Sequence, residues 1–348
     1  MSQPVALSLR RISATTRRPR YSPGPGRRLL TTTAPTSASD AAEQMMRGQQ
    51  QPATTRRQLL DANQVQKLSL ALRRRELHRG LDVSERAPPS GTPLPPGYHL
   101  VYFTPVGTED ELGPDGTDRA FNAPAPFTRR MWAGGRMSWT RGCEMRVGDE
   151  AEERTRLRSA VAKTGRDGGE MVLVDVEKQF WNEKGLALVD QRSWIFRPES
   201  DTASEVAQMP LRDALVRGPS TIEDVEHNDG GYLRRQLRWS PVGLFRFSAL
   251  TFNGHKIHYD PTWCATVEGH RGCVVHGPLN LINMLDYWRD VCDDGVVREI
   301  TYRATSPLYA GDNYQIRASN PTELEHTKQW EVLVEKDGKV CMRGSIVS

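Results

Sequence analysis

The first half of the chain is marked by alternating polar and apolar residues. Between residues 170 and 181, Val172, Val174 and Val176 alternate with Asp175 and Glu177, which is the period of two of a strand. A short strand is predicted at 98–103, and further strands of one antiparallel sheet are predicted at 136–144, 154–163 and 186–196. Before them, leucines between residues 59 and 72 recur with roughly helical spacing, and the prolines after residue 87 end that helix.

The second half is predicted to begin with a strand at 238–252 and a short helix at 261–267. Residues 276–290 form the clearest element. Apolar residues fall on nearly every side of a helix drawn over them, which predicts a helix enclosed by protein. Strands are predicted after it at 296–303, 312–318, 328–334 and 339–346. One buried helix followed by antiparallel strands is the pattern of a hotdog fold, a curved sheet wrapped around a helix.

The first half, with a helical region followed by strands, has the layout of a degenerate copy of the same unit. We therefore predict an α+β double hotdog, with an amino-terminal hotdog domain over 41–200, a linker over 201–235 and a carboxyl-terminal hotdog domain over 236–348. The length of 348 residues is sufficient for two domains with their own cores. Apolar stretches stay well below the roughly 18 residues of a membrane-spanning helix, so no membrane span is predicted.

Basic charge is concentrated at the amino terminus. The chain has 47 Lys and Arg against 43 Asp and Glu, a net charge of +4, yet seven arginines precede the first acidic residue, Asp40. Such a Ser- and Thr-rich segment is typical of a mitochondrial transit peptide. We predict that residues 1–40 direct the protein to the mitochondrial matrix, with cleavage near Leu30. A basic arm for nucleic acid is the alternative, but without these arginines the charge is about −3 (+4 minus 7), which predicts no nucleic-acid surface.

Functional groups are densest between Phe247 and His258, where an apolar run ends in Asn253, His255 and His258. Gly254 breaks the pattern and predicts a loop, and loops that leave a rigid sheet are where sites collect. An imidazole exchanges protons near neutral pH. We therefore predict that His258 is an acid/base centre with Asn253 as its hydrogen-bonding partner. A purely structural role for these histidines is the alternative.

Metal, disulfide and serine-hydrolase chemistry have little support in the sequence. His255, His258, Asp260 and Cys264 are potential ligands, but their spacing matches no compact zinc signature, so we predict no metal. The five cysteines are scattered and lack a CxxC pair, which predicts reduced thiols. A GxSxG nucleophile elbow is absent.

The start of the long helix is a second candidate position. His276, Gly277 and Pro278 open it. A glycine lets a ligand approach the first turn, whose free N–H groups and dipole favour negative charge such as a thioester enolate. The alternative is that Gly277 and Pro278 serve only to begin the helix.

Three separated segments resemble one enzyme family. They are Asn-Gly-His-Lys-Ile-His-Tyr-Asp-Pro with Val-Val-His-Gly-Pro-Leu inside 247–285, Ala-Pro-Phe-Thr-Arg-Arg-Met-Trp-Ala-Gly-Gly at 125–135, and Leu-Tyr-Ala-Gly-Asp-Asn-Tyr-Gln-Ile at 308–316. The chain is thereby similar to the MaoC-type hydratases and dehydratases of the hotdog superfamily. More narrowly it resembles fungal mitochondrial hydroxyacyl-thioester dehydratase type 2 and the mesaconyl-C4-CoA and itaconyl-CoA hydratases. The resemblance covers most of the chain after the predicted transit peptide.

The wider family carries the hydratase motif Asp-x-Asn-Pro-x-His. In this sequence Asn253 stands at the Asp position, His255 at the Asn position and His258 at that of the catalytic His. An amide cannot accept a proton, so the resemblance implies that His258 is the sole acid/base and that Asn253 orients the hydroxyl or water. Gly277 would polarise the thioester carbonyl. The narrower subfamily shares the Asn-x-His-x-x-His form, which favours a working variant over a non-catalytic thioester-binding protein.

The resemblance also implies substrate contacts outside the catalytic group: His255, Arg129, Arg130, Trp132 and His276. Exposed arginines and a core tryptophan are the simpler alternative for the first-half residues. Arg234, Arg235 and Arg238 could bind phosphates of CoA or an acidic carrier protein, although a solvated run of charges is the simpler prediction.

The function implied is dehydration of a (3R)-3-hydroxyacyl thioester, or hydration of the trans-2-enoyl thioester, in mitochondrial fatty-acid synthesis. The acyl group would be carried on the phosphopantetheine of acyl carrier protein or CoA, with no other cofactor. The alternative substrate is a branched dicarboxylyl-CoA such as itaconyl- or mesaconyl-CoA, whose distal carboxylate Lys256, Arg129 or Arg130 could hold. A homodimer is neither required nor forbidden when one chain holds both hotdogs.

Overall fold

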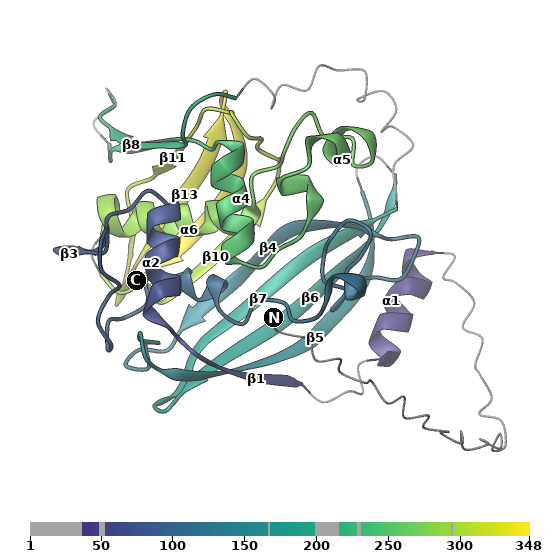
Figure 1. Ribbon diagram of the computed structural model, residues 1–348, viewed down its shortest axis with the longest axis horizontal. Helices are drawn as coiled ribbons and strands as arrows, with labels where there is room; N and C mark the ends of the chain where they lie inside the picture. Colours follow the sequence, from purple (N-terminus) through teal and green to yellow (C-terminus); the bar gives the residue numbers. More distant parts are fainter. Residues whose placement is uncertain (1–36, 49–52, 166–167, 199–215, 228–230, 294) are drawn as a thin grey trace, which may run out of the picture. The chain divides into compact units, whose positions relative to one another are not determined.

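The computed structural model describes residues 37–48, 53–165, 168–198, 216–227, 231–293 and 295–348. Within them, one 12-stranded antiparallel sheet has the order β1-β5-β6-β7-β4-β10-β14-β13-β11-β9-β8, with β12 (Thr322–Leu324) paired to β13 (Figure 1). The short strands β2 (Glu76–His78) and β3 (Leu81–Asp82) form a separate hairpin.

The sheet has two halves that join where β4 pairs with β10. The first half comprises β1 (Thr54–Leu59), β5 (Glu150–Thr164), β6 (Glu170–Asn182), β7 (Gly185–Arg197) and β4 (Arg129–Trp139). The second half comprises β10 (Glu299–Ala304), β14 (Lys339–Val347), β13 (Thr327–Lys336), β11 (Tyr314–Ala318), β9 (Arg234–Arg238) and β8 (Thr221–Val225). Because the β4–β10 pairing joins the two halves into one hydrogen-bonded sheet, it fixes the position of their concave faces relative to each other.

Five α-helices and several short helices accompany the sheet in the described residues. The α-helices are α1 (Ala38–Arg47), α2 (Ala62–Ala71), α4 (Pro241–Leu250), α5 (Pro261–Thr266) and α6 (Gly277–Tyr287). The short 3-10 helices are Tyr98–Val101, Glu109–Glu111 and Lys256–His258, and a π-helical turn, Trp288–Cys292, extends α6.

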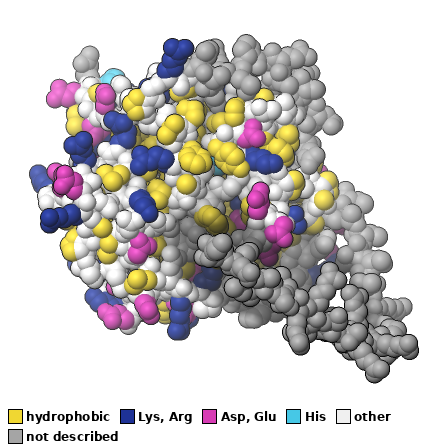
Figure 2. All heavy atoms as spheres, viewed as in Figure 1, with side chains coloured by type: hydrophobic (Ala, Val, Ile, Leu, Met, Phe, Trp, Pro, Cys, Tyr) yellow, Lys and Arg dark blue, Asp and Glu magenta, His cyan; other side chains and the backbone are white. Residues whose placement is uncertain are grey.

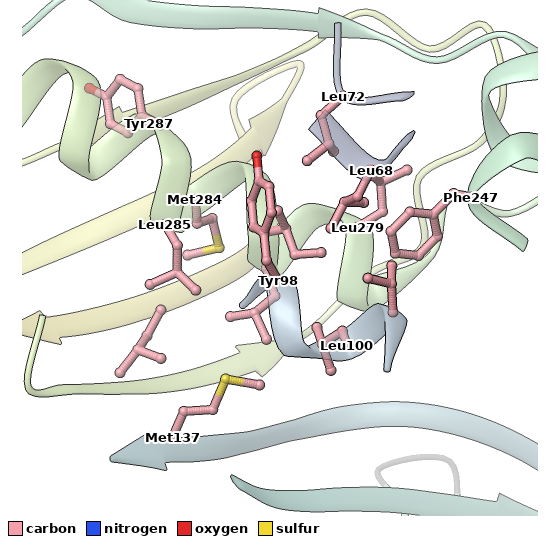
Figure 3. Close-up of a cluster of buried hydrophobic side chains, with 14 of the residues drawn as sticks. Leu68, Leu72, Tyr98, Leu100, Met137, Phe247, Leu279, Met284, Leu285 and Tyr287 are labelled. Atoms are coloured by element: carbon pink, nitrogen blue, oxygen red, sulfur yellow. The ribbon is translucent and has the colours of Figure 1, made fainter. Parts of the chain in front are cut away.

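Helix α6 is the core of the second half. From Leu279 onward its apolar side chains are at most 1% exposed, and they meet side chains of α2, α4, β4 and the 3-10 helix Tyr98–Val101 (Figure 3). The cluster includes Leu68, Leu72, Tyr98, Leu100, Met137, Phe247, Leu279, Met284 and Leu285. Burying one such side chain contributes about 1.5–3 kcal/mol, so packing on every side of α6 stabilises this half.

The first half has a different cover. Helix α1 packs its Ala38, Ala41 and Ala42 against β5 and β6, next to Leu157 and Val174. These small side chains let the helix lie close to the sheet. Within the described residues, only short helical segments and α1 lie where the first half would need a second long helix, and part of its concave face therefore stays open to a cavity.

The predicted double hotdog is confirmed, with the two sheets fused into one. Strands β5, β6, β7, β10, β11, β13 and β14 were predicted correctly, as were α5 and α6, whereas the prediction at 136–144 overlaps only the end of β4. Two predictions were wrong, because 98–103 holds a 3-10 helix and 238–252 holds α4. In α4 the Ser240 hydroxyl accepts the Gly243 N–H and Pro241 occupies the first turn, a helix start that outweighs the apolar run.

The predicted domain boundaries are not decided by these elements. Strand β8 lies inside the predicted linker, whose residues 201–215 are outside the described part, as are residues 1–36 of the predicted transit peptide. All five cysteines lie in the described residues, and none of them forms a disulfide. Among the described residues, no helix has the length and apolar character needed to cross a membrane. Figure 2 shows acidic and basic side chains interspersed over one face.

Candidate active site

One cavity of about 1640 Å³ is lined by both halves of the sheet. Strands β4, β6 and β7 contribute to its wall on one side, and residues 253–258, 274–278 and 302–308 contribute on the other. Its volume exceeds the roughly 300–1,000 Å³ of a typical small-molecule site. The cavity therefore has room for an extended substrate.

His258 ends the 3-10 helix Lys256–His258 and lines the cavity. Its Nδ1 lies 2.7 Å from the carbonyl oxygen of Val274. A carbonyl only accepts hydrogen bonds, so Nδ1 carries the hydrogen and Nε2 carries the lone pair. Burial lowers the pKa of His258 to about 4. The ring is therefore a neutral base at physiological pH.

His276 packs face to face on His258, with ring centroids 3.6 Å apart and an interplanar angle of 18°. The Ser248 hydroxyl lies 2.8 Å from His276 Nε2, and His276 Nδ1 has no hydrogen-bond partner among the described residues. Burial lowers the pKa of His276 well below its ordinary value. Because both rings are neutral, they can stack without charge repulsion, and His276 fixes the plane of the His258 ring.

Asn253 and His255 precede His258 along the same wall. The Asn253 Oδ1 accepts the His255 N–H at 3.1 Å, which forms a turn that starts the 3-10 helix. The His255 Nε2 is buried, lies 3.7 Å from a carboxylate oxygen of Asp115, and has no hydrogen-bond partner in the described residues. Since the Asn253 oxygen is engaged in the turn, its NH₂ group is the part left for a water or hydroxyl.

Gly277 opens α6 and faces Trp132 of β4. A Cβ at Gly277 would lie 3.0 Å from two indole carbons, closer than side chains normally approach. The N–H groups of the first helical turn have no intrahelical acceptor and form the positive end of the helix dipole. Gly277, Trp132, His258 and Asn253 all line the cavity. The fold thus brings together a neutral base, an amide and a helix amino terminus.

Of the basic residues predicted to contact substrate, only some lie at the cavity. Arg130 lines the cavity and lies 3.3 Å from a carboxylate oxygen of Asp118. The Arg129 Nε donates to Glu268 at 3.0 Å, and the Lys256 Nζ donates to the Pro114 carbonyl at 2.8 Å. Neither Arg129 nor Lys256 belongs to the cavity wall.

The basic run on β9 does not form one solvated patch. Arg235 is buried and bonds the carboxylates of Asp224 at 2.8 Å and Asp290 at 2.9 Å. Arg238 donates to the carbonyls of residues 217 and 219. Of Arg234, Arg235 and Arg238, Arg235 is therefore part of the packing between β8, β9 and the end of α6.

Charged side chains on the first half of the sheet were missed in the sequence. Arg56, Glu153, Lys178 and Arg192 line the cavity, and Asp190 is fully buried next to Arg192. We refer to these five residues as the charged cluster. The sequence of β7 did contain a signal for this cluster. Asp190 and Arg192 lie on the same face of the strand as the buried Leu188, and a charge at an inward strand position needs a partner.

The potential metal ligands near His258 are engaged elsewhere. The Cys264 thiol donates to the Ile257 carbonyl at 3.2 Å, and Asp260 accepts the Trp263 N–H at 2.9 Å to cap α5. In the described part of the chain, no three His, Cys, Asp or Glu side chains are grouped as a metal ion would require.

Comparison with known proteins identifies the family. Residues 97–310 match the family model described as hydroxyacyl-thioester dehydratase type 2. The chain belongs to this family. It is 31% identical over 234 residues to mesaconyl-C(4)-CoA hydratase of Chloroflexus aurantiacus, a match that covers 66% of this chain and 76% of that protein. It is 25% identical over 258 residues to the mitochondrial hydroxyacyl-thioester dehydratase type 2 of Schizosaccharomyces pombe, with coverage of 67% and 80%.

Solved structures share the fold at low sequence identity. A MaoC-like dehydratase from Phytophthora capsici has a TM-score of 0.55 and 15% identity, with 86% of this chain and 96% of that chain covered. A Mycobacterium tuberculosis protein with a double hotdog fold has a TM-score of 0.51 and 15% identity, with coverage of 85% and 96%. The predicted family resemblance is confirmed, and this dehydratase is a hydro-lyase that acts on acyl thioesters.

Proposed function

We propose that His258 is both general base and general acid in the interconversion of trans-2-enoyl and 3-hydroxyacyl thioesters. In hydration, its Nε2 takes a proton from water as the oxygen bonds to C3, and the same nitrogen returns a proton to C2. Asn253 holds the water through its NH₂ group. The Gly277 N–H stabilises the negative charge that develops on the thioester oxygen. Dehydration follows the same steps in reverse.

The hydrogen bond between His258 Nδ1 and the Val274 carbonyl carries this proposal. It fixes the tautomer that leaves a lone pair on Nε2, and burial lowers the pKa of the ring to about 4. The imidazolium formed during the reaction is then a strong acid, so it returns its proton readily. With this geometry, the one side chain of His258 can both take the proton from water and return a proton to C2.

Two metabolic roles are candidates. Fatty-acid synthesis on a mitochondrial acyl carrier protein is supported by the mitochondrial relative and by the acid-free, arginine-rich residues 1–39. Hydration of a dicarboxylyl-CoA is supported by the mesaconyl-C(4)-CoA hydratase relative and by the cavity wall, which holds eight Arg or Lys against four Asp or Glu. In both roles phosphopantetheine carries the acyl group, and the proposed steps use no metal or redox cofactor.

The test is hydration of crotonyl-CoA by the full chain, followed as loss of enoyl-thioester absorbance. His258→Ala is expected to lower kcat by roughly 10²- to 10⁴-fold, with circular dichroism confirming the fold. His326→Ala, at an exposed turn, is the matched control and should keep wild-type turnover. Substantial turnover by His258→Ala contradicts the assigned role. A folded wild-type chain that turns over neither crotonyl-, itaconyl- nor mesaconyl-CoA would favour the non-catalytic binding alternative.

A further inference from the structure

The charged cluster lies on the cavity face of the first half of the sheet. Lys178 of β6 stands opposite Asp190 of β7 in the ladder, and Arg192 stands opposite Gly135 of β4. Gly135 in turn stands opposite Tyr302 of β10. Residues opposite one another on paired strands share a face, so Arg192 and Tyr302 lie on one row that crosses the joint between the two halves.

The charges within the cluster do not balance. Arg192 Nε donates to Asp190 at 2.8 Å, while Lys178 Nζ and Arg56 Nη2 donate to the two oxygens of Glu153, at 2.9 and 2.8 Å. Three cations thus face two carboxylates. His99 lies 3.2 Å from Asp190, but burial lowers its pKa, so it adds no positive charge at neutral pH. One positive charge remains without a counter-charge inside the cluster.

Two hydrogen-bond donors beside Arg192 are also unused. The Tyr302 hydroxyl is buried, with the residue 5% exposed, and neither this hydroxyl nor the Trp132 Nε1 has a partner among the described residues. Buried donors without acceptors are unfavourable by about 1–3 kcal/mol each. The close approach of Tyr302 requires Gly135, because a Cβ there would lie 2.6 Å from the hydroxyl oxygen. Gly135 therefore permits this packing of Tyr302, which is one of the residues that line the cavity.

Trp132 connects these donors to the proposed reaction centre. One side of its indole meets Gly277, where a Cβ would lie 3.0 Å away, and the Arg192 guanidinium carbon lies 5.9 Å from the ring centroid. The Arg192 Nε and Nη2 are directed at Asp190, which leaves Nη1 for another acceptor. A single indole ring thus separates the helix amino terminus from an arginine with a free donor.

We propose that Arg192, the Tyr302 hydroxyl and the Trp132 Nε1 bind a carboxylate at the far end of the acyl group. This inference rests on the proposed function, because Gly277 and His258 fix the thioester and the double bond. The carboxylate supplies the missing negative charge and acceptors for all three donors. The preferred substrates are then enoyl thioesters of short dicarboxylic acids. A long alkyl chain would instead place methylene groups against desolvated charges.

The test compares thioesters that differ at one end only. Crotonyl-CoA and fumaryl-CoA have the same carbon skeleton, with a methyl group in one and a carboxylate in the other, and the methyl ester of fumaryl-CoA controls for size. Wild-type kcat/KM is expected to be roughly 10- to 100-fold higher for fumaryl-CoA than for either neutral thioester, as for hydrogen bonds to a charged group. A ratio at or below one, or a preference for trans-2-octenoyl-CoA, overturns the proposal.

Variants locate the preference in the named residues. The double variant Asp190→Asn, Arg192→Gln removes both charges of the pair together and so avoids leaving one unpaired, and it should lower the fumaryl-to-crotonyl ratio about tenfold. Tyr302→Phe should lower it severalfold. Arg136→Gln, an exposed residue of β4 outside the cavity wall, is the matched control and should keep the wild-type ratio. An unchanged ratio in the double variant contradicts the assignment.

Failure of this inference is distinguishable from failure of the proposed function. Crotonyl-CoA turnover that depends on His258, together with no preference for fumaryl-CoA, keeps the function and rejects the carboxylate site. Calorimetric binding of the same three thioesters to His258→Ala tests the site without any turnover. Tighter binding of fumaryl-CoA there supports the site, and equal binding of all three rejects it.

Discussion

The two halves of the sheet use their concave faces in opposite ways. In the second half, α6 fills the face with apolar side chains such as Leu281 and Leu285, which are at most 1% exposed. In the first half, α1 and an apolar cluster cover only part of the face, and the rest carries the charged cluster and borders the cavity. The same curved architecture therefore gives a closed apolar core on one side and an open charged wall on the other.

This difference separates two tasks. His258 and Gly277, the proposed catalytic groups, are held by a densely packed half, and dense packing restricts their motion. Arg192 and Tyr302 line the half that keeps space for a ligand. Buried ions are unfavourable unless paired, so the proposed substrate carboxylate would complete the pairing in the first half.

The largest expected effect is on stability in the charged half. Asp190→Ala removes the fully buried partner of Arg192, whose side chain is 16% exposed, and breaking such a pair lowers the free energy of unfolding by about 3–5 kcal/mol. Urea denaturation measures it. The double variant Asp190→Asn, Arg192→Gln should lose markedly less. A loss below about 1 kcal/mol for Asp190→Ala would show that the pair is solvated and that the contrast between the halves is overstated.

The apolar half should respond through packing alone. Leu285→Ala removes a side chain in contact with the core around α6 (Figure 3) and should lower the free energy of unfolding by about 3 kcal/mol. Leu285 is not part of the cavity wall, so kcat/KM for the folded protein should stay within about twofold of wild type. A large loss of activity at unchanged fold would mean that α6 positions the site through its packing.

The sequence revealed the fold better than it revealed the charged wall. The period of two in β5, β6 and β7 and the apolar surface of α6 are local patterns, and they were predicted correctly. Helix α4 was mistaken for a strand because its apolar run has no clear period, although Ser240 and Pro241 provide a helix start. The wrong prediction of a strand there shows that capping residues should be considered when the hydrophobic periodicity is weak.

The candidate site likewise contains residues that local motifs predicted and residues that they did not. Asn253, His255, His258 and Gly277 were found through short motifs, and the structure places all four along one cavity. Arg192 and Tyr302 are 110 positions apart, and only the pairing of β7, β4 and β10 brings them onto one row. Long-range register is not encoded in any local pattern, so this part of the site could not be predicted.

A substitution at the contact between the two halves has an intermediate expected effect. Gly277→Ala places a Cβ against the Trp132 indole and displaces it or the first turn of α6. Small displacements of positioning groups lower rates by up to about 100-fold, so we expect a 10- to 100-fold loss of kcat with crotonyl-CoA. Pairing it with Trp132→Leu should restore part of the rate. Wild-type activity in Gly277→Ala would show that Trp132 and α6 do not need this close contact.

The smallest expected effect is the response of activity to pH. Burial lowers the pKa of His258 to about 4, so the ring stays neutral and kcat/KM for crotonyl-CoA should be flat from pH 8 to pH 6. A histidine with its ordinary pKa of about 6.5 would lose roughly fourfold over that range. The measurement is kcat/KM at half-unit intervals, and a fourfold fall centred near pH 6.5 would contradict the burial of His258.

Stability should follow pH through the buried histidines of the candidate site and through His99, more than through the Asp190–Arg192 pair. Below pH 6.5 the unfolded chain binds protons on His255, His258 and His276, while the folded chain resists them because burial lowers their pKa values. The free energy of unfolding should therefore fall as the pH is lowered from 6.5 toward 4. The pKa of Asp190 is about 2, so it stays charged throughout. Asp190→Asn, Arg192→Gln should keep the wild-type slope, and His276→Gln should reduce it. A slope that the double variant reduces and His276→Gln leaves unchanged would contradict the role assigned to the site histidines.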